Sequence, residues 1–324
     1  MRSSLASLGL LFSLAACGGG SPRPDPTTPI APAAAAADEP EPQPIFAVKG
    51  HLGMFVSTPW TFSTRSYVIE GPTGLVFVDL QFTPGQATHL VDDAERAMRK
   101  KAALGIVLHP NPDKFNGTET LQKRGARVVT SAQVKAAIPA VFKQRTEAFL
   151  SRYAPDWPKV TPAPDTFGDH TTELEAGGTR VKLHVLGAGC SESHVVAEWD
   201  GDDGKHVFVG DLVGNKTHAW LELGRTDEWL ARIAEIRALK PAHVHPGRGD
   251  SAGPELLDAQ RKYLEDVVAI VAAEKPAMPM PAGAKERVKA KILALYPGYD
   301  FEVFLDLGLP AVWEHVAKKN AGAK

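Results

Sequence analysis

The sequence has little cysteine and no strong excess of either charge. Its 324 residues contain two cysteines, Cys17 and Cys190, and the formal net charge is -2. A disulfide framework is therefore excluded as the basis of the fold, and the chain offers no basic surface of the kind that binds nucleic acid. Hydrophobic residues make up 44% of the chain, enough for one large core or two smaller ones. We expect a globular protein without a nucleic-acid partner.

Long hydrophobic runs are also lacking. The apolar run Leu5–Ala16 is too short to span a bilayer as a stable helix, and it follows the positive charge of Arg2 as in a signal peptide. The segment Leu14–Cys17 resembles the lipobox of bacterial lipoproteins, which implies cleavage before Cys17 and a diacylglycerol on its sulfur. We expect a signal peptide at 1–17 and a lipid anchor in a bacterial membrane, either the outer membrane on its periplasmic side or the cell surface. The alternative is a plain secretory signal with an incidental cysteine.

Residues 18–44 are rich in glycine, proline and alanine and have almost no large apolar side chains. Such a segment cannot bury enough surface to fold, so we interpret it as a disordered tether. If Cys17 carries lipid, Cys190 has no partner for an intramolecular disulfide. Cys190 is then a free thiol, a buried structural residue or a metal ligand.

The rest of the chain alternates between strand and helix patterns. The first series consists of a hairpin over 67–78, a helix over about 84–103, a strand over 104–108, a helix near 118–124, a strand over 127–130 and a helix from 131. The second has strands at 179–186, 195–199, 206–209 and 242–245, and helices at 227–239 and 254–273. This order predicts a layered α/β (α+β) domain over 45–275. Residues 276–324 are expected to add helices near 284–295 and 309–318 that pack on its outside.

One motif directly follows the apolar run Leu104–Leu108. It contains His109 and Asp113, with Asn111 between them and Lys114 directly after Asp113. This has the frame of the metal-binding motif His-x-His-x-Asp-His of the metallo-β-lactamase superfamily. Asn111 stands at the second His position and Lys114 at the third.

Three later segments resemble the remaining motifs of that superfamily. The loop 187–196 takes the place of a Pro-Gly-His-Thr loop and puts Cys190 at the His position, and a shifted alignment makes His194 the ligand instead. Asp211 follows a strand and a glycine, as the bridging aspartate of the family does. Arg248 replaces the histidine of a Pro-Gly-His-Gly turn. The resemblance implies an αββα sandwich of two mixed sheets with helices outside, and a site on loops at one edge of the sheets.

The resemblance also implies which residues surround the two zinc positions of the superfamily. The first position would be surrounded by three good ligands and one poor one, namely His109, Cys190, Asp211 and Asn111. The second would be surrounded by two carboxylates and two cations, namely Asp113, Asp211, Lys114 and Arg248. A charged ammonium or guanidinium has no lone pair to offer a metal. We therefore expect at most one zinc ion per chain, or none, with Lys114 and Arg248 replacing the charge of the second.

The leading functional hypothesis is a hydrolase of an ester, thioester or amide, with Asp113, Lys114 and Arg248 as catalytic residues. A competing hypothesis is a metal-free binding or sensory module that captures a small anionic ligand. A third is covalent catalysis by Cys190, with His109 or His194 as its base. His245, three residues before Arg248, has two interpretations: partial compensation for the missing last ligand, or, as the favoured one, a place at the end of the strand. The other histidines show no ligand spacing in the sequence: His51, His89, His170, His184, His206 and His315.

Overall fold

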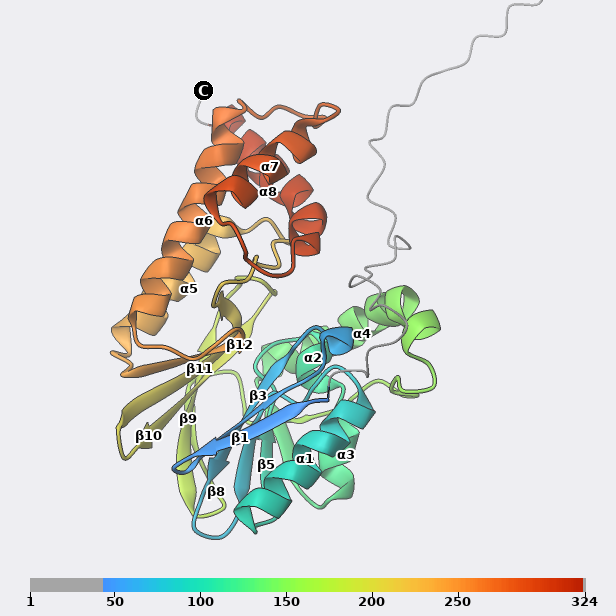
Figure 1. Ribbon diagram of the computed structural model, residues 1–324, viewed down its shortest axis with the longest axis vertical. Helices are drawn as coiled ribbons and strands as arrows, with labels where there is room; N and C mark the ends of the chain where they lie inside the picture. The colour runs from blue at the N-terminus through green and yellow to red at the C-terminus, as the bar shows by residue number, and fades with distance from the viewer. Residues whose placement is uncertain (1–42, 323–324) are drawn as a thin grey trace, which may run out of the picture.

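Two β-sheets form the centre of the protein, as the computed structural model shows for residues 43–322 (Figure 1). The first sheet has seven strands in the order β1-β2-β3-β4-β5-β6-β7. The strands up to β4 pair antiparallel, and those from β4 to β7 pair parallel. The bounds are β1 (Ile45–Lys49), β2 (Leu52–Val56), β3 (Arg65–Glu70), β4 (Leu75–Val78), β5 (Ala102–Ile106), β6 (Arg127–Thr130) and β7 (Asp165–Thr166).

The second sheet has five strands in the order β12-β11-β10-β9-β8. Its antiparallel part runs from β8 to β11, and β12 pairs parallel with β11. The bounds are β8 (Thr172–Ala176), β9 (Thr179–Leu186), β10 (His194–Gly201), β11 (Gly204–Gly214) and β12 (His243–Arg248). Both sheets are therefore mixed, as the sequence predicts.

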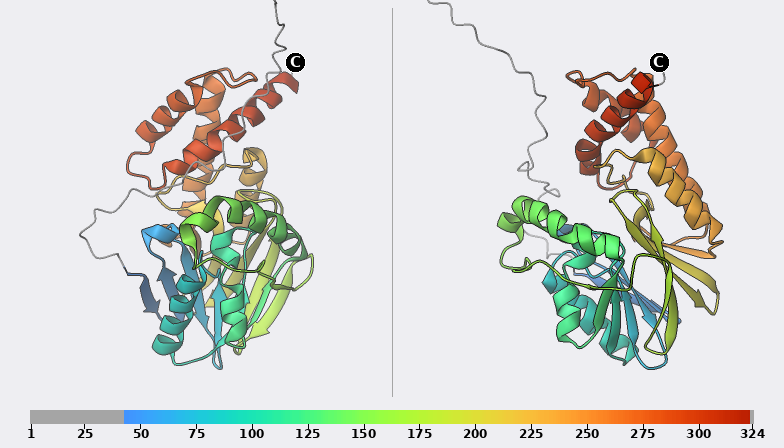
Figure 2. Two further views of the ribbon diagram at one scale, coloured as in Figure 1. Left: turned by 90° about the vertical axis from the view of Figure 1, so that its right-hand side faces the viewer. Right: turned by 180° about the vertical axis from the view of Figure 1, so that it is seen from behind.

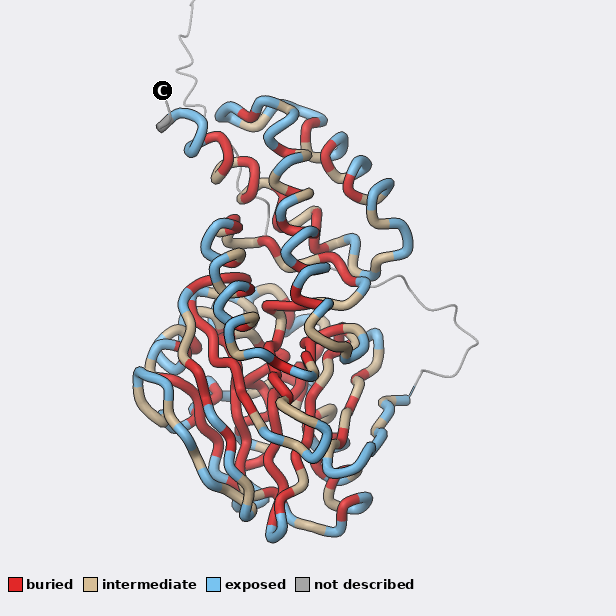
Figure 3. The backbone as a smooth tube through the Cα atoms, turned by 90° about the vertical axis from the view of Figure 1, so that its left-hand side faces the viewer, coloured by how far each residue is buried: buried red, intermediate tan, exposed pale blue. Residues whose placement is uncertain are grey.

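Side-chain alternation explains why the second sheet is covered on both faces. Successive side chains of a strand point to opposite faces. In β10, Val195 and Ala197 join the core between the sheets, whereas Val196 joins a second core on the outer face. In β11, Phe208 faces the first sheet and Val207 faces outward. Figure 3 shows the strands as an almost continuous buried layer.

Helices cover the outer faces. Along the first sheet these are α1 (Pro84–Met98), the short α2 (Pro112–Phe115), α3 (Thr118–Lys123) and α4 (Ala132–Tyr153). Helix α1 begins where the Thr83 side chain accepts a hydrogen bond from the Gln86 amide, and α4 begins at the equivalent cap of Ser131. The second sheet is covered by α5 (Thr226–Ala238) and α6 (Glu255–Ala273). The layers are thus helix, sheet, sheet and helix (Figure 2).

The chain ends in two further helices, α7 (Ala284–Leu295) and α8 (Val303–Gly322), which gather with α5 and α6 at one end of the sandwich (Figures 1 and 2). Apolar side chains of α7 and α8, such as Ile292 and Leu309, share the outer core with Leu264 of α6. Helix α8 also reaches the inner core through Phe304. None of the helices within 43–322 has the length and apolar character needed to cross a bilayer.

Most expected elements lie within a few residues of their observed bounds. The main difference is the helix expected over 84–103, which ends at Met98. Arg99 takes a left-handed conformation with φ 54°, and Ala102 already begins β5. The expected strand over 104–108 accordingly starts two residues earlier. The signal peptide and nearly all of the tether expected from the sequence lie outside the described residues.

Candidate functional site

The candidate residues come together at one edge of the two sheets. His109 follows β5, Asp211 lies in the second half of β11, and Arg248 ends β12. The amide of Val195 donates to the carbonyl of Leu108 at 2.6 Å, which fastens the start of β10 to the loop that carries His109. The loops therefore converge, and the segments that resemble separate motifs in the sequence form one site.

A buried ion-pair cluster occupies the centre of this edge. The Lys114 ammonium lies 2.9 Å from Oδ2 of Asp113 and 2.9 Å from Oδ1 of Asp211. The Arg248 guanidinium donates to Oδ2 of Asp211 at 2.6 Å and to Oδ2 of Asp113 at 2.9 Å. Its third donor, Nε, reaches the carbonyl of Phe62 at 3.3 Å. Each cation thus bridges the same two carboxylates.

The cluster keeps its charges despite burial. Burial acts to lower the pKa of Lys114, but the Asp113 and Asp211 carboxylates outweigh it and hold that pKa above its ordinary value. Burial likewise acts to raise the pKa of Asp211, but Arg248 and Lys114 hold it well below its usual range. Two positive and two negative groups therefore neutralise each other inside the protein, as buried charges must.

Asp79 is a third carboxylate of this cluster, and the sequence reasoning missed it. Its Oδ2 lies 3.6 Å from the Lys114 ammonium, and its Oδ1 accepts a hydrogen bond from the Leu108 amide at 3.0 Å. Burial raises the pKa of Asp79 to about 6, which the nearby Lys114 cation only partly opposes. The signal was present in the sequence, because Asp79 directly follows the buried strand β4 as Asp211 follows part of β11.

A glycine makes the close packing of the cluster possible. A Cβ atom on Gly247 would clash with Oδ1 of Asp211 and lie 2.9 Å from Nζ of Lys114. Any side chain there would push the ion pairs apart, so the Pro-Gly-Arg turn of β12 needs glycine before Arg248.

A second group of side chains lies beside the ion pairs. His109, Cys190 and His194 are all buried, and each offers one ligand atom such that the three atoms lie within 4.8 Å of one another. Nε2 of His109 is 3.6 Å from Oδ2 of Asp211 and has no hydrogen-bond partner among the described residues. Its other ring nitrogen is 3.0 Å from Oγ of Ser191. A buried imidazole nitrogen without a partner is the kind of atom that a metal ion satisfies.

The hydrogen bonds of His194 fix the direction of its lone pair. Nδ1 lies 3.0 Å from the carbonyl oxygen of Gly187, which can only accept, so Nδ1 carries the hydrogen. Burial lowers the pKa of His194 to about 3, so the ring is neutral and its Nε2 lone pair points at Sγ of Cys190, 3.2 Å away. Burial raises the pKa of the Cys190 thiol well above its usual value. The pair is therefore neutral, which does not favour a free thiolate nucleophile.

Aromatic side chains close the site on its outer side. A cavity of about 20 Å³ touches Asp113, Asp211 and Arg248 and is otherwise lined by, among others, Phe62, Phe82, Asn111, Phe149, Trp220 and Phe304. This volume holds one water molecule and no substrate. The Arg248 guanidinium carbon lies 5.4 Å from the centroid of the Phe304 ring. Helix α8 therefore contributes to the cover, which the motifs did not reveal.

Solved metallo-β-lactamases share this architecture. The enzyme from Pontibacter korlensis superposes with a TM-score of 0.56 and 18% identity over 69% of this chain and 100% of its own. FIM-1 from Pseudomonas aeruginosa, in its mono-zinc form, superposes with a TM-score of 0.53 and 17% identity over 70% of this chain and 96% of its own. The metallo-β-lactamase from Hirschia baltica superposes with a TM-score of 0.52 and 19% identity over 68% of this chain and 97% of its own. The chain has the metallo-β-lactamase fold. No protein-family model and no curated protein matches the sequence.

The two metal positions of the metallo-β-lactamase motifs differ in their fit to a metal. The first is surrounded by His109, Cys190 and His194, whose ligand atoms converge. Nε2 of His109 is also buried and has no hydrogen-bond partner among the described residues. Imidazole and thiolate suit a transition metal, so these residues fit one ion. At the second, the Lys114 ammonium already lies between Asp113 and Asp211, so a metal does not fit there.

The alternatives left open by the sequence are therefore not exclusive, because Cys190 and His194 both approach His109. Asn111 lines the small cavity beside Asp113, and its role as a ligand stays a prediction, as do the catalytic roles of Asp113, Lys114 and Arg248. The suggestion that His245 substitutes for the missing last ligand is wrong. Its Nε2 lies 2.9 Å from Nδ1 of His206, away from this site.

Proposed function

We propose that this chain binds one transition metal ion at the site of His109, Cys190 and His194 and hydrolyses an ester, thioester or amide of a small molecule. The convergence of these three ligand atoms, with Nε2 of His109 buried and unpartnered, carries the proposal. Zinc is the metal that suits this mixture of imidazole and sulfur ligands. The fold of the metallo-β-lactamases supports the class of reaction but not the substrate.

A metal bound at this position would supply Lewis-acid polarisation of a carbonyl group. Residues around this position already hold the ligand side chains and nearby charges in a fixed arrangement. Gly187 fixes the ring of His194 so that its lone pair faces inward. Lys114 and Arg248 hold Asp211 as a charged carboxylate next to His109. These fixed charges and dipoles need no rearrangement during a reaction, and preorganisation of this kind is what lowers barriers in hydrolases.

Substrate access requires movement of the aromatic cover, because the cavity at the ion pairs has a volume of about 20 Å³. Phe304 lines this cavity, whereas its stacked neighbour Phe301 contacts the same guanidinium without lining it. Truncation of Phe304 should therefore open the site, and truncation of Phe301 serves as the matched control.

The test measures zinc content and hydrolysis together. The full chain is purified in detergent without chelator, loaded with Zn²⁺ and assayed against aryl esters, thioesters and anilides. We expect His109→Ala and Cys190→Ser each to lose one zinc ion and the hydrolytic activity, and Phe304→Ala but not Phe301→Ala to raise kcat/KM. Hydrolysis that survives in both His109→Ala and Cys190→Ser would overturn the proposal.

A second candidate function is a non-catalytic binding protein for a small, anionic ligand, because Arg145 and Arg248 both line the cavity. Each of the three guanidinium nitrogens of Arg248 already has a protein partner, and the Arg145 side chain lies 3.2 Å from Oε1 of Glu222. A ligand would have to displace Glu222 from Arg145. A chain that binds one zinc ion at His109 and hydrolyses none of the test compounds, even as Phe304→Ala, would support this candidate instead.

A further inference from the structure

A large cavity lies between the β1–β2 hairpin of the first sheet and strands β11 and β12 of the second. Its volume is about 560 Å³, within the range of pockets that bind small molecules. Its lining is largely apolar on the hairpin side, with Val48, Leu52 and Met54. On the side of the second sheet it meets a group of histidines. The cavity is separate from the site described above and is many times larger.

The histidines lie at the beginnings of β11 and β12, opposite to the ends that carry Asp211 and Arg248. His206 pairs in register with His243 on the neighbouring strand, so both rings project from the same face. At about 3.3 Å per residue, the five residues from His206 to Asp211 place the two sites roughly 16 Å apart. A ligand at one therefore does not touch the other.

Asp203, in the turn before β11, completes the group. Its Oδ1 lies 2.8 Å from Nε2 of His206, and its Oδ2 lies 3.3 Å from Nε2 of His243. The ligand atoms of these three residues all lie within 4.8 Å of one another. Sequence patterns did not predict this group, because His206 and His243 are separated by a helix and show no motif spacing.

A chain of hydrogen bonds begins at Nδ1 of His206. Nδ1 of His206 is 2.9 Å from Nε2 of His245, and Nδ1 of His245 is 2.8 Å from Oγ of Ser251. Oγ of Ser251 is 3.4 Å from the hydroxyl of Tyr67, which in turn donates to the carbonyl of Pro246 at 2.8 Å.

A carbonyl only accepts, so the Tyr67 hydroxyl must donate to it, and its oxygen is left to accept from Ser251. If Ser251 donates to Tyr67, it accepts from His245, and His245 accepts from His206. In this direction the chain accepts a hydrogen from Nδ1 of His206. In the opposite direction Ser251 donates to His245 and His245 donates to His206, and only the 3.4 Å contact between Ser251 and Tyr67 loses its hydrogen. The chain can therefore accept a hydrogen from Nδ1 of His206 or donate one to it.

When no metal is bound, a hydrogen on Nε2 of His206 satisfies the 2.8 Å contact with Oδ1 of Asp203. A divalent metal ion on Nε2 would take the place of that hydrogen, lie against the same carboxylate and leave the ring hydrogen on Nδ1, where His245 accepts it. The relay through His245 is then the outer-shell support that metal-binding histidines usually have.

We propose that Asp203, His206 and His243 form a second metal site, which takes a zinc-like divalent transition metal on the wall of the 560 Å³ cavity. Two imidazoles and a carboxylate are a common ligand set for such ions. Three protein ligands leave a fourth position of a tetrahedral site free for water or for a donor group of a molecule in the cavity. A second metal site goes beyond the limit of one zinc ion per chain expected from the sequence, because that limit was argued from the loops of the first site alone.

The test uses the full chain in detergent, titrated with Zn²⁺ in equilibrium dialysis. A Cys190→Ser background removes the thiolate ligand of the first site, and Co²⁺ spectra report any remaining sulfur coordination. We expect Asp203→Asn and His243→Ala each to lose one zinc ion relative to that background. His170→Ala is the matched control, because His170 pairs with Asp169 at 2.8 Å on the exposed surface and lines no part of the cavity.

Ser251→Ala tests the relay, because it interrupts the hydrogen-bond chain without touching a ligand. We expect zinc to bind about 10- to 100-fold more weakly in this variant, the usual effect of losing outer-shell support. Both ligand positions are partly exposed, so Asp203→Asn and His243→Ala should fold, and circular dichroism verifies this. If neither folded variant loses a zinc ion, or the background itself binds none, the proposal is wrong.

Discussion

Nζ of Lys114 lies 2.9 Å from Oδ1 of Asp211, and the side chain of Lys114 is completely buried. In the superfamily's motif, Lys114 stands at a position of a zinc-binding histidine. In this alignment the ammonium stands in the place of a metal ligand, and it contacts Asp211, which aligns with the bridging aspartate of the superfamily. The positive charge of Lys114 supplies part of the charge of a metal ion, and its flexible side chain fills the space of an imidazole ring. The following predictions test this replacement and its consequences.

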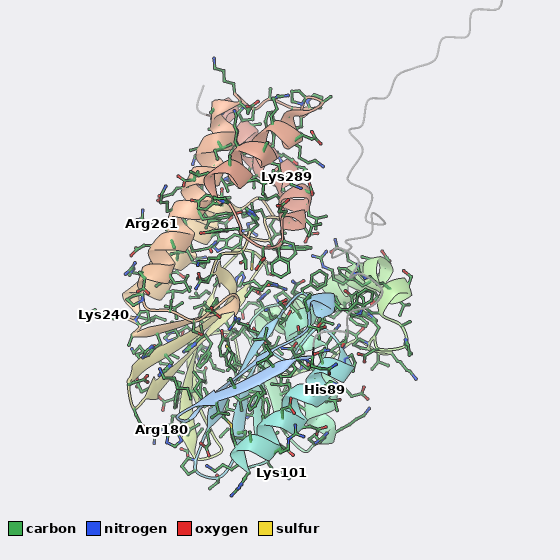
Figure 4. The ribbon with its side chains drawn as sticks, in the orientation of Figure 1. His89, Lys101, Arg180, Lys240, Arg261 and Lys289 are labelled. Atoms are coloured by element: carbon green, nitrogen blue, oxygen red, sulfur yellow. The ribbon has the colours of Figure 1, made fainter. Side chains whose placement is uncertain are left out.

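Removal of Arg248 should destabilise the protein strongly. Arg248→Ala leaves Asp113 and Asp211 with one cation fewer in a buried place, and the loss of one partner of such a pair costs about 3–5 kcal/mol. Urea denaturation measures the free energy of unfolding. The control is Arg261→Ala, since Arg261 projects to solvent from α6 and pairs only with Glu265 (Figure 4). Its loss should cost about 0.3–0.5 kcal/mol. Equal effects of the two substitutions would contradict the buried cluster.

Asp79 should make stability depend on pH in the acidic range. Its pKa rises from the ordinary 3.8 to about 6 on folding, so between these values the folded chain binds the proton more tightly than the unfolded chain. The stability that this gives is present at low pH and is lost as the pH rises through about 6. The amide of Asp79→Asn resembles the neutral carboxylic acid, so this variant should not lose stability as the pH rises through about 6.

We therefore expect the unfolding free energy of Asp79→Asn, relative to wild type, to increase by about 2–3 kcal/mol from pH ~4 to pH ~7. Urea denaturation at both pH values measures it. Asp250→Asn is the control, since Asp250 is 84% exposed and should show little change. A difference between Asp79→Asn and wild type that stays constant with pH would show that Asp79 is charged throughout this range.

Restoring the histidines should restore the second metal position. The fourfold variant Asn111→His, Lys114→His, Cys190→His and Arg248→His provides imidazoles at all four positions that depart from the superfamily's motifs. We expect it to bind one more zinc ion than wild type and to gain thermal stability on zinc addition, because the metal binds only the folded state. Elemental analysis and calorimetry are the measurements. A folded variant with unchanged zinc content would show that the motif positions do not converge as aligned.

We propose that Cys17 anchors the protein in a bacterial membrane, on the basis of the lipobox-like sequence alone, since Cys17 lies outside the described residues. Cys17→Ser should move the protein from the membrane fraction to the soluble periplasmic fraction of a Gram-negative host. The wild-type chain analysed in the same way is the reference. Wild-type protein already found in the soluble fraction would argue for a plain secretory signal.

The sequence predicted the fold well because each element has a local signal. The β10 alternation of Val195, Val196 and Ala197 determines which side chains face which core, and the caps Thr83 and Ser131 mark where helices begin. The segments that resemble the motifs also lie close together in the structure, because they stand at or near strand ends at the same edge of the two sheets.

The remaining features depend on contacts between distant segments. Asp79 reaches Lys114 only because two parallel strands end side by side, and Phe304 reaches Arg248 from the last helix. His206 and His243 became a pair through strand register. None of these distances is encoded in a local pattern, so periodicity and motif spacing could not reveal them.

The contact between Phe304 and Arg248 links the end of the chain to its centre. The ring of Phe304 in α8 covers the guanidinium, so it lowers the local dielectric constant in which Arg248 meets Asp113 and Asp211. Attraction between charges grows as that constant falls. A chain shortened before α8 would therefore keep every residue of the motifs and still weaken the ion pairs, because their strength depends on a helix that no motif contains.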